Sequence, residues 1–548
     1  MPPRWRNPFR RLFTNYPLWP VLVCLGILWF GLIGTYGFLG SEEPRYARIP
    51  QEMADRGDWV VPVLKGYPWM EKPPLLYWGI MASNALFGRT EFAARFPSAL
   101  LALLFTAFLH GAVRDVFGRR AAFFAALSLG TTLLYSAFAM AAVMDIHLTV
   151  FLGAGLLLFW RSWLGFEGKA PVRHPNIHLW GACFAFGVAA LAKGLVSLAV
   201  PVLAIVPFLV MAGGWRHYLH WRILPGILLF LAAAVPWHLL MIRRQGFHFV
   251  LVYFINHHLA RFFTSIHHHS KPFWFYLPVL LMGLFPWTPF LFKMRGLRDA
   301  LRRAGEDARA SGTAFALCWA FFPFLFFSVS EAKLAGYILP LFPALALFLA
   351  LGTERFIDDE QPDRTLAAFV LGTPVVVALA MPVFVKVRFD RLLEGIGFGL
   401  LFLAAALPFL GLYRRGKRAA AAASVSLMLF IPALVGIPAF FETFEPDFNR
   451  RHVCEAVKRL TGPDNPLVVF QHLHHSIDYY TGYTCSENIL EPPLLADLLV
   501  RRPSPVYVLT LMENYSHILL PPGFRMKPLF RIGTSLVVKV TRLEVPAP

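Results

Sequence analysis

Long apolar runs are the feature that most constrains how this chain can fold. Runs of about 17–25 residues, the length that a helix needs to cross a bilayer, recur from Leu18 to Phe440. Of the 548 residues, 57% are hydrophobic and only 15% are charged, whereas a soluble chain of this length would carry more polar residues. The sequence therefore predicts a polytopic α-helical membrane protein.

We predict about thirteen transmembrane helices, although adjacent short runs can be merged or split. The predicted spans are Leu18–Leu39, Ala93–Val113, Ala121–Ala141, Ile146–Trp160, His178–Ala192, Leu195–Ala212, Ile223–Ile242, Phe273–Phe292, Thr313–Phe327, Tyr337–Gly352, Leu366–Val387, Ile396–Leu412 and Ala419–Phe440. They make residues 1–440 a transmembrane domain. The runs that end at Trp160 and begin at His178 are short for a bilayer.

The composition changes after Phe440. The chain becomes polar, with short runs of strand-forming residues separated by helix-like or turn-rich pieces. The strand-like runs are Pro466–Phe470, Ser504–Thr510 and Ser535–Val540. Residues 441–548 are therefore predicted to form a C-terminal soluble α/β domain.

Basic residues predict the orientation of the chain. Arginine and lysine favour cytoplasmic loops, and the N-terminal segment and alternate loops carry them, at Arg4, Arg6, Arg10, Arg11, Arg114, Arg119, Arg120, Arg161, Lys169, Arg173, Lys293 to Arg309, and Arg414 to Arg418. This places the N-terminus in the cytoplasm and, with an odd number of spans, the C-terminal domain in the periplasm. The same loops explain the net charge of +19, so no nucleic-acid partner is expected. In that oxidising compartment we also predict a disulfide between Cys454 and Cys485.

The outward loops collect unusual polar residues. The first begins with SEEPRYARIP (Ser41–Pro50), which contains Glu42 and Glu43; the piece Pro44–Asp55 is amphipathic and suits a membrane surface. Cations beside aromatics occur at Lys72, Lys193, Arg261 and Lys333, where few basic residues are expected. A single residue of this kind often has no functional role, because its side chain only extends to the lipid headgroups or forms a weak surface ion pair. Together with Glu42, Glu43 and Asp145 they favour a reaction centre at a lipid phosphate.

These residues also carry a resemblance to a known family. The segment EEPRYARIPQEMADRGDWVVPVLKGYPWMEKPPLLYW is similar to the first outer loop of the aminoarabinose transferase (ArnT) family, relatives of the protein O-mannosyltransferases with the GT-C fold. The family pattern Asp-Glu-x-Arg-Tyr followed by Glu-Lys-Pro is matched at Arg45, Tyr46, Glu71, Lys72 and Pro73. Further matches are Asp145, LAKG at Lys193, NHHLARF at Arg261, SKPFWFY, and KLAGYILPLFPALAL at Lys333–Leu347. Two departures are Glu42, where the family has aspartate, and His257, where it has an acid in Asn-Glu-His-Leu.

The resemblance implies an inverting glycosyltransferase. An acceptor oxygen would attack the anomeric carbon of a sugar carried on polyprenyl (undecaprenyl) phosphate, with lipid A as the expected acceptor. Lys72, Arg261 and Tyr337 are expected to meet in one cavity and stabilise the leaving phosphate, with Lys193 and Arg45 as second choices. Glu42 would act as a general base or bind the sugar, and Asp145 is the second carboxylate.

Several points stay open at this stage. Glu71 and His258 could ligate a divalent metal ion across two loops, but no ligand spacing demands it and no metal site is predicted. Tyr46, Glu71, His258 and Lys333 are expected to help bind substrate. The sugar is unspecified, a glycan or protein acceptor is an alternative to lipid A, and a monomer in the bacterial inner membrane is expected. The competing classes are a transporter and a lipid-binding scaffold. A transporter would place ionisable residues near the middle of the bilayer, whereas most predicted spans lack internal charge.

Overall fold

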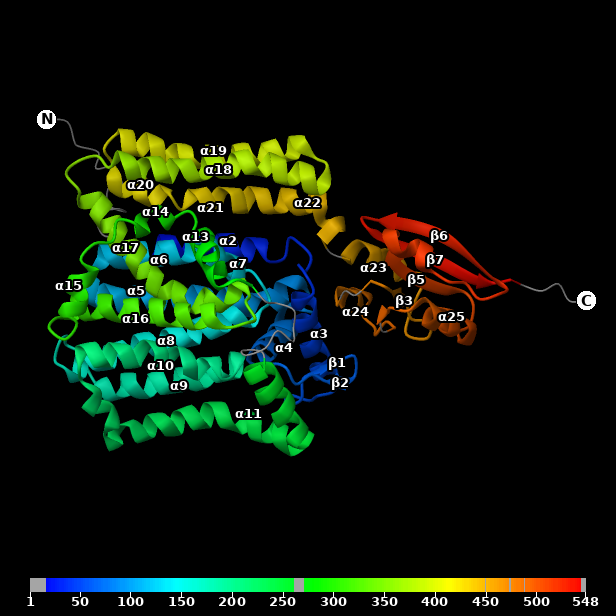
Figure 1. The fold of residues 1–548 in the computed structure, drawn as a ribbon, viewed down its shortest axis with the longest axis horizontal. Helices are drawn as coiled ribbons and strands as arrows, with labels where there is room; N and C mark the ends of the chain where they lie inside the picture. The colour runs from blue at the N-terminus through cyan, green and yellow to red at the C-terminus, as the bar shows by residue number, and fades with distance from the viewer. Residues whose placement is uncertain (1–15, 261–270, 449, 473–474, 487, 544–548) are drawn as a thin grey trace, which may run out of the picture. The chain divides into compact units, whose positions relative to one another are not determined.

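A computed structural model describes residues 16–260, 271–448, 450–472, 475–486 and 488–543 (Figure 1). The chain divides into two compact units. The helical unit consists of Met1–Ile33, Trp69–Gly79 and Arg95–Ile437. The outer unit consists of Gly34–Pro68, Ile80–Ala94 and Pro438–Pro548. The second unit thus joins two early segments of the chain to the C-terminal part.

Nine helices within the described ranges are long and apolar enough to cross a membrane, or ten if the bent pair α6 and α7 is one span. The nine cover α5 (Glu91–Phe117), α8 (Met144–Phe166), α9 (Pro175–Lys193), Trp221–His257 with α11 (Leu224–Val250), α16 (Ala308–Val329), Ala335–Asp358 with η5 (Ala335–Leu341) and α17 (Phe342–Asp358), α18 (Arg364–Phe389), α19 (Leu392–Arg414), and Arg418–Phe444 with α20 (Arg418–Ser424), α21 (Leu427–Ile431), η6 (Pro432–Gly436) and α22 (Ile437–Phe448). The runs that are short in the sequence pattern become full-length helices, because α8 and α9 extend through flanking residues to 23 and 19 residues.

Shorter elements complete the helical part of the chain. Four apolar helical segments of 10–17 residues are α2 (Trp19–Leu32), α4 (Leu75–Phe87), α10 (Val196–Ala212), and Phe273–Gly283 with η4 (Phe273–Phe275) and α13 (Tyr276–Gly283). The remaining pieces are η1 (Trp215–Leu219), η2 (Trp221–Ile223), η3 (Leu251–Ala260), α14 (Thr288–Leu291) and α15 (Leu297–Arg302).

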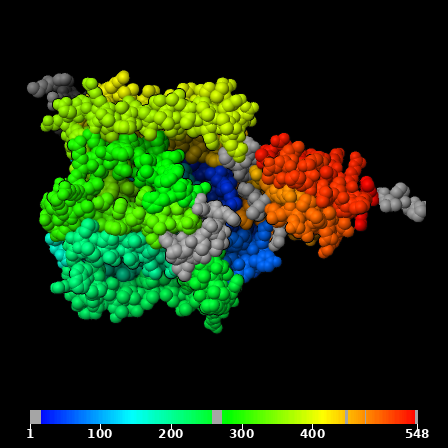
Figure 2. Space-filling model, viewed as in Figure 1, coloured from blue at the N-terminus to red at the C-terminus, as the bar shows by residue number. Residues whose placement is uncertain are grey.

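Apolar side chains cover the outside of the helical unit. On α18 and α19, Val376, Leu379 and Leu393 are 65%, 71% and 79% exposed. These two helices form a continuous outer surface of the unit in the space-filling view (Figure 2). Exposed aliphatic surface of this kind is stable against lipid rather than water, which agrees with the predicted membrane protein.

Glycines let α8 and α9 pack closely. A Cβ atom at Gly155 on α8 would lie 2.3 Å from the ring of Phe186 on α9, and one at Gly187 would lie 2.7 Å from the Phe230 carbonyl oxygen on α11. Small residues are the usual means of close helix approach in membranes. The two helices run antiparallel, so the start of α8 and the end of α9 share one end of the bundle.

A bend separates α6 (Arg119–Thr131) from α7 (Leu133–Ala139) by 65°. Thr132 is extended there, with φ −75° and ψ 140°. The backbone N–H of Leu133 is satisfied by the carbonyl of Phe285 at 2.9 Å. A break inside an apolar region is tolerated when another segment accepts the freed backbone donor.

Ion pairs connect α6 and α17 at the end of the helical bundle opposite to Asp145. Arg120, at the start of α6, contacts Glu354 at 3.2 Å and Asp358 at 2.5 Å near the end of α17. Glu354 also accepts from Arg309 at 3.2 Å. These basic residues belong to the loops that predict a cytoplasmic face.

The outer unit contains a mixed five-stranded sheet in the order β4-β3-β5-β7-β6. Its strands are β3 (Val468–Phe470), β4 (Asn488–Ile489), β5 (Val506–Leu511), β6 (Phe524–Ile532) and β7 (Ser535–Arg542), and its helices are α23 (Arg451–Val457), α24 (Ser476–Thr481), α25 (Pro492–Arg501) and η7 (Met512–His517). β3 pairs in parallel with β4 and β5, whereas β7 is antiparallel to β5 and β6. The three strand-like runs in the sequence thus form β3, β5 and β7.

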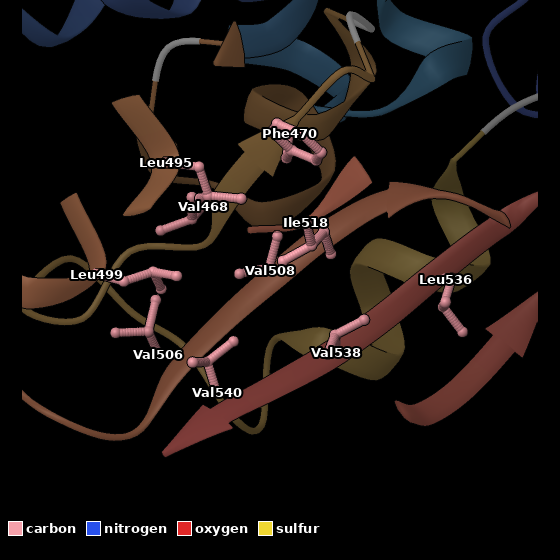
Figure 3. Packing of buried hydrophobic residues seen from close by; sticks show 10 residues of the cluster. All are labelled: Val468, Phe470, Leu495, Leu499, Val506, Val508, Ile518, Leu536, Val538 and Val540. Atoms are coloured by element: carbon pink, nitrogen blue, oxygen red, sulfur yellow. The ribbon is translucent and has the colours of Figure 1, made fainter. Parts of the chain in front are cut away.

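One face of the sheet packs into a hydrophobic core (Figure 3). Leu495 and Leu499, one turn apart on α25, are fully buried against the sheet residues Val468, Val508 and Val538. The alternating apolar residues of the strands supply one buried face, and the i, i+4 spacing of the leucines supplies the other.

The predicted disulfide is not formed. Cys454 and Cys485 are both free thiols, buried at 1% and 4% exposure. Burial raises the pKa of Cys485 to about 11 and also raises that of Cys454. Two protonated, enclosed thiols behave as small apolar side chains, so they serve packing instead of cross-linking.

Candidate functional site

The stretch SEEPRYARIP is helical rather than an extended loop. It opens α3 (Glu42–Asp55) of the outer unit. Glu42 and Glu43 occupy the first turn, where carboxylates favour the positive end of the helix dipole, and Pro44 is tolerated because N–H groups there lack helical partners. The helix therefore begins at the acidic pair.

Helical spacing puts three of the predicted site residues on one side of α3. Glu42 Oε1 lies 3.6 Å from Arg45 Nη2, and the Arg45 guanidinium lies 5.1 Å from the centre of the Tyr46 ring. The Glu42 side chain is 51% exposed, while that of Arg45 is 16% exposed. The carboxylate of Glu42 is thus presented to the surroundings by a largely buried arginine.

The neighbouring acid has a different environment. Glu43 is 5% exposed and its Oε2 accepts a hydrogen bond from the Leu39 backbone N–H at 2.9 Å. A carboxylate buried in this way stabilises the entry to the helix. Of the two acids, Glu42 is the accessible one.

The sequence pattern suggested that the amphipathic face of α3 lies on a membrane surface. In the structure this face is covered by protein instead. Ile49 and Met53 on this face are completely buried, and the helix packs against β1 (Val63–Leu64) and α24 within the outer unit. The apolar residues of α3 are therefore buried against other parts of the protein.

The imidazole of His475 also lies near this helix. Burial, together with the nearby cations Arg45 and Lys65, lowers the pKa of His475 to about 4.

A second polar cluster occurs in the helical unit. Asp145 lies in the first turn of α8 and Lys193 in the last turn of α9, so each charge complements its helix dipole. The Lys193 Nζ is 2.5 Å from Asp145 Oδ1 and 4.5 Å from the centre of the Tyr337 ring, which belongs to η5. Side-chain exposures of 17% and 14% for Asp145 and Lys193 show a mostly enclosed ion pair. Residues 145, 193 and 337, far apart in the sequence, are thus brought together.

Two further residues shape this cluster; both lie in stretches that match the family, but neither was singled out as a site residue. Gly336 lies against the carboxylate, because a Cβ there would be 2.7 Å from Asp145 Oδ1 and 2.7 Å from the Phe138 ring. Tyr276 is fully buried, and its hydroxyl lies near Tyr337 and Asp145. Tyr276 stands in an aromatic run, FWFY, in which nothing distinguishes one ring from the next.

Lys333 has an internal set of partners. It is 4% exposed, and its Nζ donates to the Lys271 carbonyl oxygen at 3.0 Å and to the Ser330 carbonyl oxygen. A lysine that bonds two backbone carbonyls fixes the approach to η5, which carries Tyr337.

The remaining predicted residues fall in or next to two loops. Glu71 Oε1 lies 3.8 Å from His257 Nε2, with side-chain exposures of 28% and 11%, and Lys72 beside it is half-buried. Arg261 and the side chain of His258 lie outside the described residues, so the expected meeting of Lys72, Arg261 and Tyr337 stays a prediction. In the described parts of the chain, no group of three histidine, cysteine or acidic residues is arranged to hold a metal ion.

Comparison with known sequences identifies a matching family profile and several similar proteins. The profile of the family described as dolichyl-phosphate-mannose-protein mannosyltransferase matches residues 71–239. The undecaprenyl phosphate-alpha-4-amino-4-deoxy-L-arabinose arabinosyl transferase of Erwinia tasmaniensis is 32% identical over 413 residues, 72% of each chain. The protein of the same name from Aeromonas salmonicida is 37% identical over 58% of this chain and 56% of its own length. Several other relatives of this name are matched over 54–60% of their length.

Solved structures agree on the fold. The structure of ArnT from Cupriavidus metallidurans bound to undecaprenyl phosphate superposes with a TM-score of 0.81 at 23% identity, covering 95% of this chain and 97% of that one. The Archaeoglobus fulgidus oligosaccharyltransferase shares the arrangement more distantly, with a TM-score of 0.51 at 12% identity over 92% and 70% of the two chains. With the Erwinia relative covered over more than two thirds of its length, the chain belongs to the undecaprenyl phosphate-aminoarabinose arabinosyl transferase family, membrane glycosyltransferases of the GT-C fold.

Proposed function

We propose that this chain transfers 4-amino-4-deoxy-L-arabinose from undecaprenyl phosphate to lipid A on the outer face of the inner membrane. The observation that carries the proposal is the enclosed cluster of Asp145, Lys193 and Tyr337 at one end of a bundle of apolar helices. Relatives whose names state this sugar and this carrier support it. A polar centre at the end of the spans suits a substrate whose phosphate lies at headgroup depth and whose tail lies in lipid.

The cations would act on the phosphate. Displacement of the sugar leaves an anionic polyprenyl phosphate, and fixed positive charge in a site poor in water stabilises a leaving group most effectively. Lys193 is preoriented by Asp145, and the Tyr337 hydroxyl is a further donor. We assign the same role to Lys72 and Arg261.

The carboxylates would act on the sugar and the acceptor. A hydroxyl acceptor needs a general base, for which Glu42, exposed and next to Arg45, is the proposed group. A phosphate of lipid A is already ionised and needs no base, in which case Glu42 orients the sugar or pairs with its amino group. Attack by the acceptor opposite to the departing phosphate gives inversion at the anomeric carbon.

The same proposal covers membrane topology. The nine long spans and the bent pair α6 and α7 supply up to ten crossings in the described residues. In the proposed topology the shorter apolar helices α2, α10 and Phe273–Gly283 would bring the number to thirteen. With the basic loops in the cytoplasm, Asp145, Glu42 and the C-terminal residues 441–548 face the periplasm. The chain would act as a monomer.

Lipid analysis tests the proposed function. Mass spectrometry of lipid A from cells with and without this chain should show an added aminoarabinose that depends on the chain and is lost in Asp145→Asn. Unmodified lipid A with a new modification on a glycan or protein would favour the other acceptors of the same fold. If no envelope molecule changes and Asp145→Asn and Glu42→Gln leave the cellular function intact, a transporter or scaffold would replace the enzyme.

Cysteine labelling tests the orientation. Single cysteines at the exposed positions Ser41 and Lys417, in a background without the native Cys24 and Cys183, are treated with a membrane-impermeant reagent. Only the cysteine at position 41 should react in intact cells. Labelling at position 417 alone, or at both positions, would contradict the topology.

A further inference from the structure

A tight turn in the outer unit holds the backbone of Lys65 in an unusual conformation. Strands β1 and β2 (Tyr67–Pro68) form a small hairpin whose two turn residues are Lys65 and Gly66. Both have positive φ, 55° for Lys65 and 84° for Gly66. Glycine adopts this conformation freely, but a lysine rarely does. The surroundings must therefore hold Lys65 in place.

Helix α3 fixes this turn through hydrogen bonds from the turn backbone to Glu52. The Glu52 carboxylate accepts hydrogen bonds from the backbone N–H groups of Lys65 at 3.2 Å and Gly66 at 3.1 Å. The same carboxylate is paired with Arg48, whose Nε lies 3.0 Å away. Arg48 and Glu52 are 8% exposed each. The turn is thus fixed to α3 by a buried, fully engaged acid.

The side chain of Lys65 then reaches the C-terminal part of the chain. Its Nζ lies 3.0 Å from Oδ2 of Asp478 on α24, and the Asp478 side chain is only 4% exposed. The other oxygen, Oδ1, accepts from the Cys485 backbone N–H at 2.9 Å. A continuous chain of polar contacts therefore runs from α3 through the turn to α24, and a buried pair of this kind is sensitive to removal of either member.

We propose that the Lys65–Asp478 pair is a latch by which the C-terminal segment positions α3 and so orients Glu42, Arg45 and Tyr46 for sugar transfer. The inference rests on the proposed function for the role of those three residues, but the latch itself rests only on contacts within the outer unit. Lys65 and Asp478 are positioning residues that act through Glu52 and α3. Their loss should slow turnover while leaving the affinity for the carrier phosphate largely unchanged, because no cation of the helical unit is altered.

Two variants test the latch. Lys65→Met keeps the length of the side chain without its charge, and Asp478→Asn keeps the shape of the carboxylate and its acceptor oxygen for Cys485. In each, amide hydrogen exchange of peptides covering residues 42–55 should rise about tenfold, while exchange in β5 and β7 stays at the wild-type rate. The kcat of transfer should fall about tenfold with less than a twofold change in KM for the donor. Lys65→Arg, which retains the charge, should restore most of both properties.

A matched control separates the latch from a general loss of charge. Arg89 pairs with Asp55 at the other end of α3, and both side chains are about half exposed. Arg89→Met should leave exchange and turnover unchanged, because exposed pairs contribute little. The latch is refuted if Lys65→Met and Asp478→Asn leave α3 exchange or kcat at the wild-type value, or if Arg89→Met raises exchange and lowers kcat to the same extent. If the wild-type chain shows no transferase activity, the proposed function fails and the exchange of α3 alone decides the latch.

Discussion

The exchange of Gly336 for alanine should lower turnover without unfolding the protein. A single added methyl group would lie 2.7 Å from Asp145 Oδ1 and 2.7 Å from the Phe138 ring. Ordinary contact requires about 3.4 Å, so the carboxylate, the ring or both must move by about 0.7 Å. The carboxylate is the free end of a short side chain and is the easier of the two to displace. That movement would disturb its 2.5 Å contact with Lys193.

The size of the effect follows from the geometry. Misplacement of a reacting or orienting group by about 1 Å can cost about a hundredfold in rate. A shift of about 0.7 Å should therefore reduce kcat by about 10- to 100-fold, equivalent to about 1.4–2.7 kcal/mol in the barrier. The thermal midpoint should change little, because the backbone of Gly336 has no positive φ that would exclude alanine.

Transfer from undecaprenyl phosphate-aminoarabinose to lipid A, measured in detergent with purified protein, provides the assay. Gly181→Ala is the control. Gly181 lies on α9, the helix that carries Lys193, and the new methyl group would meet only Leu158 of α8, at 3.3 Å. It should retain wild-type kcat. Wild-type kcat in Gly336→Ala, or an equal loss in Gly181→Ala, would refute the reasoning that links Gly336 to the Asp145 carboxylate.

Three further predictions test the charged groups. Glu42→Gln should lower kcat about 100-fold, whereas Glu42→Asp should retain part of the activity and Glu43→Gln nearly all of it; transfer rates of the three variants measure this, and equal losses at both positions would contradict the assignment. Lys193→Met should weaken binding of undecaprenyl phosphate about tenfold or more, as measured by titration, and Lys193→Arg should recover part of it. Because burial and two nearby cations lower the pKa of His475 from 6.5 to about 4, the stability that its neutral form provides is complete above about pH 6.5 and is lost as the pH falls toward 4. At about pH 5 the loss should be about 1–2 kcal/mol after allowance for partial exposure, and His475→Asn should be less acid-sensitive in thermal unfolding.

The sequence predicted the membrane class for reasons that the structure makes clear, and it singled out two residues that the structure pairs. Bilayer thickness imposes long apolar runs, so the spans are visible without tertiary information. Asp145 and Lys193 stand out because an ionised residue at the edge of an apolar run is costly unless it is paired. Their partnership could be predicted only as a shared site, since no local spacing relates residues 48 positions apart.

Other features depend on tertiary contacts. The position of SEEPRYARIP after an apolar run placed it in an outward loop, whereas in the structure it opens helix α3, which packs against β1 and α24. The same packing overrode the expected membrane-surface position. Lys65 gave no signal, because its positive φ and its pairing with Asp478 depend on Glu52 and on a segment more than 400 residues away. Cysteine count and compartment favoured a disulfide, but those criteria hold no information about whether two thiols are joined.

In the proposed function, the enclosed cluster of Asp145 and Lys193 serves transfer of aminoarabinose from undecaprenyl phosphate to lipid A. Purified wild-type protein, incubated with this donor and lipid A, should yield lipid A that carries one added aminoarabinose with inverted anomeric configuration, detected by mass spectrometry and nuclear magnetic resonance. Folded Asp145→Asn and Lys193→Met proteins should yield little of this product. Absence of the product from the wild-type reaction, or undiminished product from both variants, would contradict the account.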